Sequence, residues 1–403
     1  MTENFKCVSL QRKPGEKYPL DFLGEASAER VHSFHKSFDA YSPTPLRELQ
    51  GLAGQLGLKS FYLKDESYRF GLNAFKVLGG SYAIGQYIAS RLGEDIFALP
   101  YRRMISDEVR ARLGEITFVT ATDGNHGRGV AWTANQLHQR SVVLMPKGSA
   151  PERLHNIQAE GADASITDLN YDEAVRLANQ MAEENGWVMV QDTAWEGYTD
   201  IPTWIMQGYT TMAYEAHQQL ELIGEKPTHI FLQAGVGSLA GAVCGFFSSL
   251  YGEERPIITI VEPNQADCLY RTAEAGDGKL RFVTGDMDTI MAGLACGEPC
   301  TIGWNVLRDW ADNFVSCPDY VAAKGMRTLG NPVGEDSRVV SGESGAVTTG
   351  LVAALMGDPE LRWLKEKLKL DESSRVLCFS TEGDTDKENY RQIVWDGKYP
   401  SFH

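Results

Sequence analysis

The chain has 403 residues and a net charge of −16, and its composition is ordinary for a globular protein, 43% hydrophobic and 23% charged. The length is enough for two domains, and the acidic balance argues against nucleic acid or an anionic membrane surface as a partner. The first twenty residues lack the basic start and apolar run of a signal peptide. No window is apolar over the roughly 18 residues needed to span a bilayer, so we expect a cytoplasmic protein.

Seven cysteines are present, with no CxxC pair and no neighbouring histidines at metal-ligand spacing. This pattern predicts reduced thiols and no metal site. The sequence leaves open whether Cys268 and Cys296 form a disulfide.

Residues 1–45 are polar and weakly periodic, and the proline-containing stretch 41–49 predicts a helix that runs to about Leu56. A strand at 61–64, a polar turn and a helix at 77–92 follow. Residues 90–116 predict a helical insertion with a solvated face.

Lys76 lies where that polar turn becomes the helix. The positive end of the helix dipole disfavours an ammonium, and the flanking Phe75 and Val77 would remove water from it, so we expect the pKa of Lys76 to be lowered. Such an amine is a nucleophile of the kind that forms a Schiff base. Taken alone, a solvated surface lysine is the commoner case.

From residue 117 onward, strands and helices alternate, which predicts α/β architecture with mostly parallel sheets flanked by helices. We predict strands at 117–121, 141–146, 164–169, 187–193, 229–234, 256–262, 338–341 and 375–380. Two domains are expected: a large one from 1–80 and 186–403, and a small one from 81–185. Ligands of such folds bind at the carboxyl ends of the strands.

A glycine-rich turn, QAGVGSLAGA (233–242), separates a predicted strand from a predicted helix. Gly235 and Gly237 have no β-carbon, so backbone N–H groups at the helix start can converge on an anion. Three interpretations fit this segment equally well. They are a monophosphate site, a G-x-G-x-x-A dinucleotide site with Glu262 on the ribose, and a tight packing turn.

A second turn, TATDGNHGRG (120–129), also follows a strand. Asn125 offers a donor and an acceptor, suited to a ring hydroxyl or a carboxylate, and Asp123 adds a negative charge. An ordinary loop is the alternative. His126 has no second ligand at metal-site spacing and is interpreted as structural.

Two further strand ends carry polar side chains. Asp192 lies just after WVMV (187–190), at the carboxyl end of its predicted strand and next to aromatic residues that are more often core than pocket. Ser380 and Thr381 end the last strand, and their hydroxyls could meet a heterocycle nitrogen or cap a turn.

The segment GESGA (342–346) approximates the G-x-S-x-G nucleophile elbow, with Ser344 as the nucleophile of a serine hydrolase. This alternative is weakened because the only histidine after it is His403, the last residue.

In this order, the lysine, the asparagine turn, the glycine loop and the late hydroxyls resemble the fold-type II pyridoxal-phosphate enzymes, the group of tryptophan synthase β and threonine dehydratase. The resemblance extends from about Pro43 to Asp386. Within that group, the chain is most similar to the diaminopropionate ammonia-lyase family. The motifs that carry this similarity are FGLNAFK, TDGNHGRGVAW, MPKGSA, QDTAWEGYT, IPTWIMQGY, IMAGLACGEP, SGESGAV and STEGDTD.

The resemblance implies pyridoxal 5'-phosphate in an inter-domain cleft, bound through Lys76. Asn125 would contact its ring hydroxyl, and Ser380 or Thr381 its pyridine nitrogen; a neutral hydroxyl there favours elimination over transamination. The phosphate would be held by Gly235, Val236, Gly237, Ser238 and Leu239. The chain departs from the broad group at Ala74, where serine is common, and at Asp123, where a small residue is usual.

The implied reaction is α,β-elimination of 2,3-diaminopropionate to pyruvate and two ammonia, on both isomers. Lys76 would take the Cα proton of the L-isomer and Asp123 that of the D-isomer, with Asp192 the second choice for holding the β-amino group. A serine or threonine dehydratase of the same fold is the alternative. Alternatives from other classes are an NAD-dependent dehydrogenase and the serine hydrolase. A small amino-acid substrate and a homodimer are expected as partners.

Overall fold

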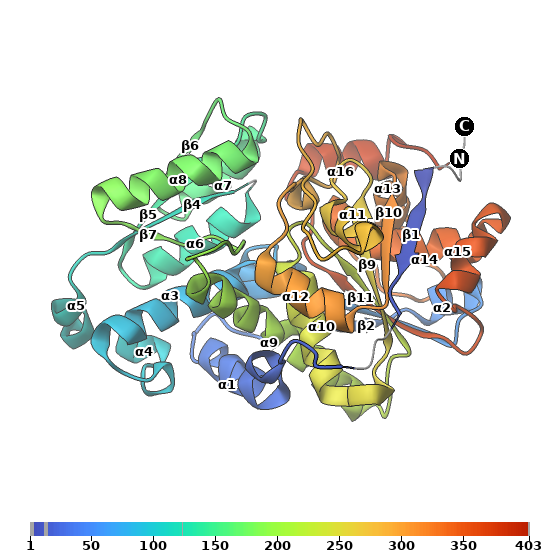
Figure 1. Ribbon diagram of the computed structural model, residues 1–403, viewed down its shortest axis with the longest axis horizontal. Helices are drawn as coiled ribbons and strands as arrows, with labels where there is room; N and C mark the ends of the chain where they lie inside the picture. Colours follow the sequence, from blue (N-terminus) through green and yellow to red (C-terminus); the bar gives the residue numbers. More distant parts are fainter. Residues whose placement is uncertain (1–3, 12–14, 123, 402–403) are drawn as a thin grey trace.

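The computed structural model describes residues 4–11, 15–122 and 124–401, so the predictions at Asp123 and His403 lie outside the described residues. Two sheets organise the chain (Figure 1). The larger has seven strands in the order β1-β10-β9-β8-β11-β3-β2, and the smaller has four in the order β6-β5-β4-β7. Only the edge strands β1 and β2 pair antiparallel with their neighbours in the described sheets. The predicted α/β class is confirmed.

The strands of the larger sheet are β1 (Lys6–Ser9), β2 (Leu46–Glu48), β3 (Ser60–Asp65), β8 (His229–Gln233), β9 (Ile257–Pro263), β10 (Asn313–Cys317) and β11 (Arg375–Ser380). Those of the smaller sheet are β4 (Thr117–Ala121), β5 (Arg140–Met145), β6 (Asp163–Ile166) and β7 (Val188–Met189). The smaller sheet therefore lies within residues 117–189, and the domain boundaries at 81 and 186 stay a prediction.

Helices cover both faces of the larger sheet. Side chains alternate between the faces as the strand period of two requires: Leu377 and Phe379 join one core cluster, and Val376 and Cys378 join the other. The first cluster is built with α1 (Glu25–Lys36), α3 (Val77–Leu92), α9 (Asp200–Leu222), α10 (Ser238–Tyr251) and α12 (Thr301–Trp310). The second is built with α2 (Gln50–Leu56), α13 (Asp319–Gly330), α14 (Glu343–Gly357), α15 (Arg362–Lys367) and α16 (Lys387–Val394).

The smaller sheet is also covered on both faces. The alanines of α8 (Tyr171–Asn185) pack on one side, and α6 (Asn125–Gln136) and α7 (Pro151–Ala159) pack on the other. The insertion predicted at 90–116 contains the short helices α4 (Tyr101–Met104) and α5 (Asp107–Leu113). The remaining helix, α11 (Cys268–Ala275), lies against β10 and β1.

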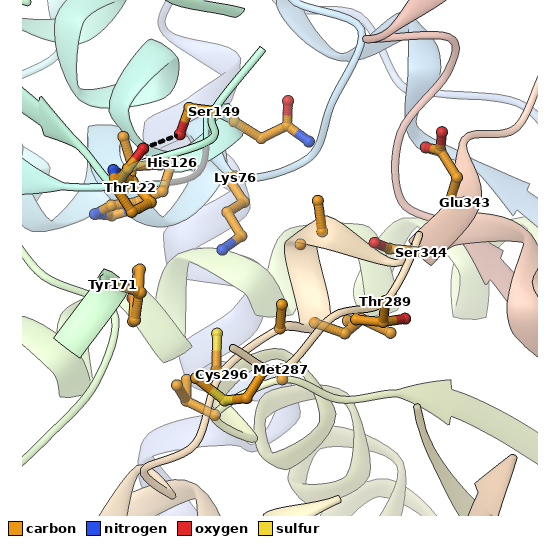
Figure 2. A pocket seen from close by; sticks show the side chains of 18 of the residues that line it. Lys76, Thr122, His126, Ser149, Tyr171, Met287, Thr289, Cys296, Glu343 and Ser344 are labelled. Carbon is orange, nitrogen blue, oxygen red and sulfur yellow. Dashed lines mark hydrogen bonds between the residues drawn. The ribbon is translucent and has the colours of Figure 1, made fainter. Parts of the chain in front are cut away.

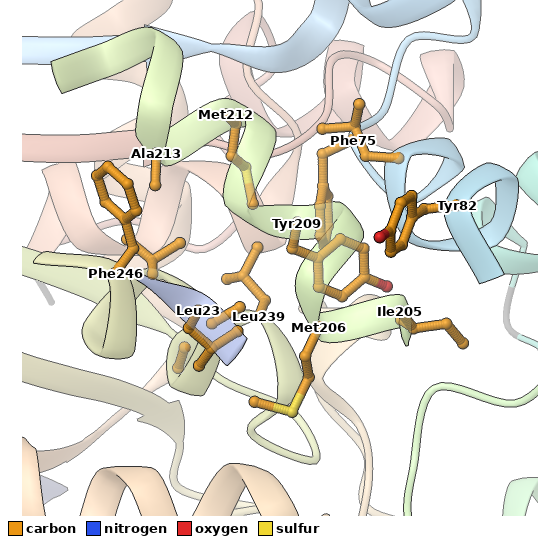
Figure 3. Close-up of a cluster of buried hydrophobic side chains, with 14 of the residues drawn as sticks. Leu23, Phe75, Tyr82, Ile205, Met206, Tyr209, Met212, Ala213, Leu239 and Phe246 are labelled. Carbon is orange, nitrogen blue, oxygen red and sulfur yellow. The ribbon is translucent and has the colours of Figure 1, made fainter. Parts of the chain in front are cut away.

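The helices α3 and α9 cross closely beneath the lysine turn. A β-carbon at Gly208 of α9 would collide with the carbonyl oxygen of Leu78, and one at Gly79 of α3 would lie 2.6 Å from the ring of Tyr209. The Tyr209 ring also packs against Phe75 at a centroid distance of 4.8 Å (Figure 3). The glycines at this crossing thus let α9 pack closely against the start of α3.

A fully buried ion cluster holds the segment that leads to the lysine turn. The Lys64 ammonium donates to Glu215 at 2.8 Å, to the Thr44 carbonyl at 2.7 Å and to Gln219 at 2.9 Å. The guanidinium of Arg69 bridges two carboxylates, because it donates to both oxygens of Glu66 and both of Glu215. The cluster ties β3 and the turn after it to α9.

Several local predictions are wrong. The helix predicted to run to about Leu56 is α2, but the strand β2 just before it was not predicted. Residues 338–341 form no strand. The turn predicted at 120–129 is already helical from Asn125. β1, β10 and α1 were not predicted. In the part of the chain that the structure describes, no helix combines the length and apolarity needed to cross a membrane.

Candidate active site

A cavity of about 670 Å³ lies where strands of both sheets end. Its walls come from the segments after β4, β5, β7, β8 and β11 and from the loop that precedes α12. The carboxyl ends of parallel strands are the expected ligand site of such sheets.

Lys76 lies in this cavity as the N-cap residue of α3. The segment before it pairs with the end of the last strand: Phe75 donates its N–H to the Thr381 carbonyl at 3.0 Å, and Gly383 donates to the Asn73 carbonyl at 3.0 Å. The lysine side chain is 17% exposed. Figure 2 shows its amine pointing into the cavity, between Tyr171 on one side and Ser344 on the other.

Asp192 faces the lysine. Its Oδ2 accepts a hydrogen bond from Lys76 Nζ at 2.9 Å. Burial opposes ionisation of this carboxyl, but the charge and hydrogen bond of Lys76 outweigh burial and hold the pKa of Asp192 at about 2. Asp192 is therefore a carboxylate at neutral pH, suited to holding a cation and unsuited to exchanging protons there.

The glycine loop forms another wall, to which Gly235, Val236, Gly237, Ser238 and Leu239 all contribute. Gly237 has a left-handed backbone (φ +99°), which favours glycine, and α10 begins at the next residue. The Ser238 hydroxyl donates to the Asp192 carbonyl, which links this loop to the segment after β7. The positive end of α10 therefore faces the cavity.

The carboxylate proposed for a dinucleotide ribose has another role. Glu262 is buried and accepts hydrogen bonds from the N–H groups of Leu269 and Tyr270, in the first turn of α11. It is a helix cap and is absent from the described cavity lining. This removes the feature that favoured a dinucleotide over a monophosphate.

Asn125 lines the cavity as the first residue of α6. The Thr122 hydroxyl accepts from the N–H groups of Gly124 at 2.9 Å and Gly127 at 3.1 Å, which shapes the turn around it. His126 Nε2 hydrogen bonds to the Val190 carbonyl at 2.8 Å. That bond agrees with the structural interpretation of this histidine.

The two late hydroxyls differ in position. Thr381 lines the cavity, and its Oγ1 accepts from Gln233 at 2.9 Å. Ser380 instead donates to Ser341 Oγ at 2.8 Å and is fully buried. The strand alternation explains this, because neighbouring residues point to opposite faces.

Other cavity residues carried no signal in the sequence. Tyr171 begins α8, Arg153 comes from α7, and Glu343 and Glu382 are buried carboxyls near Thr381. The loop 285–296, apart from Met291, also lines the cavity. Glu382 lies within the motif STEGDTD, but nothing in that motif singles out its carboxyl.

Ser344, the candidate nucleophile, also lines the cavity. Within the described part of the chain, no histidine hydrogen bonds to its hydroxyl. The nucleophile and base of a hydrolase are therefore not assembled among these residues.

The cavity residues fit pyridoxal phosphate. Lys76 supplies an amine for the aldehyde, the glycine loop at the start of α10 supplies donors for the phosphate, and Thr381 supplies a neutral hydroxyl. A β-carbon at Gly235 would lie 3.3 Å from the Gly293 carbonyl oxygen, so a larger residue would crowd the glycine loop.

Comparisons with known proteins agree with this geometry. The model of the pyridoxal-phosphate dependent enzymes matches residues 38–382. The diaminopropionate ammonia-lyase of Escherichia coli strain K12 is 52% identical over 386 residues, which cover 96% of this chain and 95% of that protein.

Solved structures of the E. coli diaminopropionate ammonia-lyase are also similar, at 49% identity and with 98% of each chain covered. The complex with D-serine has a TM-score of 0.92. The complex with an aminoacrylate–pyridoxal phosphate azomethine reaction intermediate has a TM-score of 0.90. The resemblance seen in the sequence and its cofactor are confirmed, and the dehydrogenase and hydrolase alternatives are set aside. The chain belongs to the pyridoxal-phosphate dependent enzymes and, within them, to the diaminopropionate ammonia-lyases.

Proposed function

We propose that the protein converts 2,3-diaminopropionate and one water to pyruvate and two molecules of ammonia. The observation that carries the proposal is the Lys76 amine, held 2.9 Å from Asp192 in the cavity that the glycine loop also lines. When bound, pyridoxal phosphate withdraws electrons from the substrate Cα and makes its proton acidic.

The protein's own residues would bind the cofactor and move the substrate proton. Lys76 binds the cofactor covalently and, once released, takes the Cα proton of the L-isomer. The glycine loop from Gly235 to Leu239 holds the phosphate, and Asn125 contacts the ring hydroxyl. Of the two candidate hydroxyls, we assign Thr381 to the pyridine nitrogen, because Thr381 lines the cavity and Ser380 bonds to Ser341.

Asp192 is proposed to hold the second amino group of the substrate. Its low pKa keeps it charged at neutral pH, and in the structure it already accepts from an ammonium, that of Lys76. Serine and threonine lack this second amine, so the contact would favour diaminopropionate over them.

Activity on both isomers is also proposed. A second base would be needed on the opposite side of the substrate, and Asp123 is the candidate from the sequence; its side chain is not described. The complex of the E. coli relative with D-serine supports a site that admits D-amino acids. A D-serine dehydratase activity is therefore the second candidate function. A cytoplasmic homodimer remains our expectation for this chain.

The experiment is an absorption spectrum followed by steady-state kinetics. Purified protein should show a visible band that borohydride shifts and that Lys76→Ala lacks. Turnover should be fastest on D- and L-diaminopropionate and slower on D-serine and L-threonine. Asp123→Asn should abolish turnover of the D-isomer and affect the L-isomer less. Faster turnover of serine or threonine than of either diaminopropionate isomer would overturn the proposal, and equal loss on both isomers would overturn the two-base assignment.

A further inference from the structure

Behind Thr381 lies a short chain of hydrogen bonds that ends on a buried carboxyl. Gln233 Nε2 donates to Thr381 Oγ1 at 2.9 Å and also to the Phe379 carbonyl at 2.9 Å. The Thr381 hydroxyl donates to Glu382 Oε2 at 3.1 Å, and the other oxygen, Oε1, accepts from the Gly345 N–H at 2.7 Å. Glu382 is 5% exposed and lines the same cavity.

The hydrogens in this chain can be counted. A hydroxyl has one hydrogen to donate and two lone pairs to accept with. While Glu382 is ionised, the Thr381 hydrogen is used on the carboxylate, so Thr381 can only accept from a cavity ligand. When Glu382 is protonated, its own O–H can donate to Thr381 Oγ1. The Thr381 hydrogen is then available to the cavity.

We propose that Glu382 is a positioning residue that sets the direction of the Thr381 hydroxyl, so that only its protonated form lets Thr381 donate to an unprotonated pyridine-type nitrogen. The ligand class is thus a heterocycle whose ring nitrogen accepts a hydrogen bond. This inference rests on the proposed function, because it takes the ring to be that of pyridoxal phosphate.

A second observation shows that the described residues leave a hydrogen-bond acceptor open at this wall, which a water or a donor group of the ligand other than its ring nitrogen would complete. Gln233 Oε1 is buried and has no hydrogen-bond partner among the described residues, although its amide nitrogen is fully used. Buried polar atoms are rarely left unpaired unless a ligand or water completes them. Gln233 also lines the cavity beside Thr381.

The surroundings of Glu382 favour its protonated form. Burial raises the pKa of Glu382 to about 7, against the opposing hydrogen bonds from Gly345 and Thr381. Of the neighbouring charged groups, Glu343 of α14 raises this pKa and Arg153 of α7 lowers it. Glu343 is itself a buried carboxyl with a raised pKa, and it accepts from Asn389 at 2.5 Å. It serves as the matched control, because it lines the same cavity without touching Thr381.

The experiment measures the affinity of the cofactor-free protein for pyridoxal phosphate between pH 6.5 and pH 8. A parallel titration uses 1-deazapyridoxal phosphate, whose ring has carbon in place of the nitrogen. Over this range we expect the affinity of the wild type for pyridoxal phosphate to fall about eight-fold relative to that of Glu382→Gln, because Glu382 loses its proton whereas the titration of the free cofactor's ring nitrogen is common to both proteins. For the analogue, the two proteins should change alike. Glu382→Gln should lack this excess loss, since its amide donates to Thr381 at every pH.

Glu343→Gln should keep the excess loss of the wild type. Thr381→Val should lack the excess loss as well, although it leaves the charge of Glu382 in place. It serves as a second variant if Glu382→Gln folds poorly, and melting temperatures report whether each variant folds. An equal fall in the wild type and Glu382→Gln, or disappearance of the excess in Glu343→Gln, would overturn the inference and leave the proposed function standing. A wild type that forms no borohydride-fixed adduct at Lys76 would overturn both.

Discussion

Two lysine–carboxylate pairs lie along the same stretch of chain and have opposite surroundings. Lys64 donates to Glu215 at 2.8 Å and Lys76 to Asp192 at 2.9 Å, so the contacts themselves are alike. The Lys64 side chain is 0% exposed and has three acceptors, which use all of its hydrogens. The Lys76 side chain is 17% exposed and lies in a cavity large enough for a cofactor.

The difference shows that an ion pair alone does not mark a site. An ammonium whose hydrogens all have buried acceptors has none left for a ligand, so the Lys64 pair is structural. A pair at a cavity wall can exchange its partner for a ligand. Exposure and acceptor count separate these roles, and the following predictions test that separation.

The largest expected effect is that of Lys76→Ala on turnover. We expect kcat to fall by roughly four orders of magnitude or more, as for other residues that bond covalently to the reacting group. The cofactor-free protein should also lose about 2 kcal/mol of stability, because the buried Asp192 loses its ionic partner. Single-turnover kinetics and calorimetry measure the two effects. A variant that keeps a tenth of the activity would contradict the role of this amine.

The Lys64→Met variant should show the reverse pattern. Removing one partner of a buried pair leaves uncompensated negative charge, so we expect a loss of about 3 to 5 kcal/mol in the free energy of unfolding. Urea denaturation measures this loss. Turnover per folded molecule should stay within a few-fold of the wild type. A midpoint that does not move would mean that the cluster around Arg69 and Glu215 tolerates the missing charge.

The two regions are joined through the crossing of α3 and α9, which Gly208→Ala should disturb. The added methyl would collide with the Leu78 carbonyl, so we expect a loss of about 2 to 3 kcal/mol and weaker binding of pyridoxal phosphate. Gly54→Ala in α2 is the matched control, because a β-carbon there meets nothing within 4 Å. Equal melting temperatures for the two variants would show that the helices can move apart at no cost.

The smallest effect concerns the pH dependence of the Lys76–Asp192 pair. The pKa of Asp192 is lowered from 3.8 to about 2, so its contribution to stability is present above pH 4 and is lost as the pH falls through 2. The shift corresponds to about 2 kcal/mol. The difference in unfolding free energy between the wild type and Asp192→Asn should be constant from pH 7 to pH 5 and should shrink below pH 4. A difference that already varies between pH 7 and pH 5 would assign the titration to another group.

Local patterns in the sequence predicted much of the fold. The helix at 77–92 and the strand–glycine–helix unit at 233–242 agree with α3 and with β8 and α10. Such units can be predicted because periodicity and glycine placement act within a few residues. The edge strand β1 and the strand β10 were missed, since their four or five residues carry no clear alternation.

The site was predicted where chemistry and local structure coincide, and missed where distant residues meet. The cavity contains Lys76 and the glycine loop as expected, but 116 positions separate Lys76 from Asp192, and no local rule pairs them. Strand parity could have chosen Thr381 over Ser380, since Thr381 shares a face with Leu377 and Phe379. To choose between the two hydroxyls, however, one must also know which face of the sheet meets the cavity, and only the assembled sheet shows this.

The antiparallel bridge between Ala74 and Glu382 has a consequence for how the enzyme can move. It fastens the lysine turn to the end of β11, whose neighbour β8 leads into the glycine loop, so the two attachment points proposed for the cofactor belong to the same sheet. Asn125, Tyr171 and Arg153 follow the four-stranded sheet instead. A movement of that sheet against the larger one would therefore change the contact proposed for Asn125, while Lys76 and the glycine loop would keep their positions relative to each other.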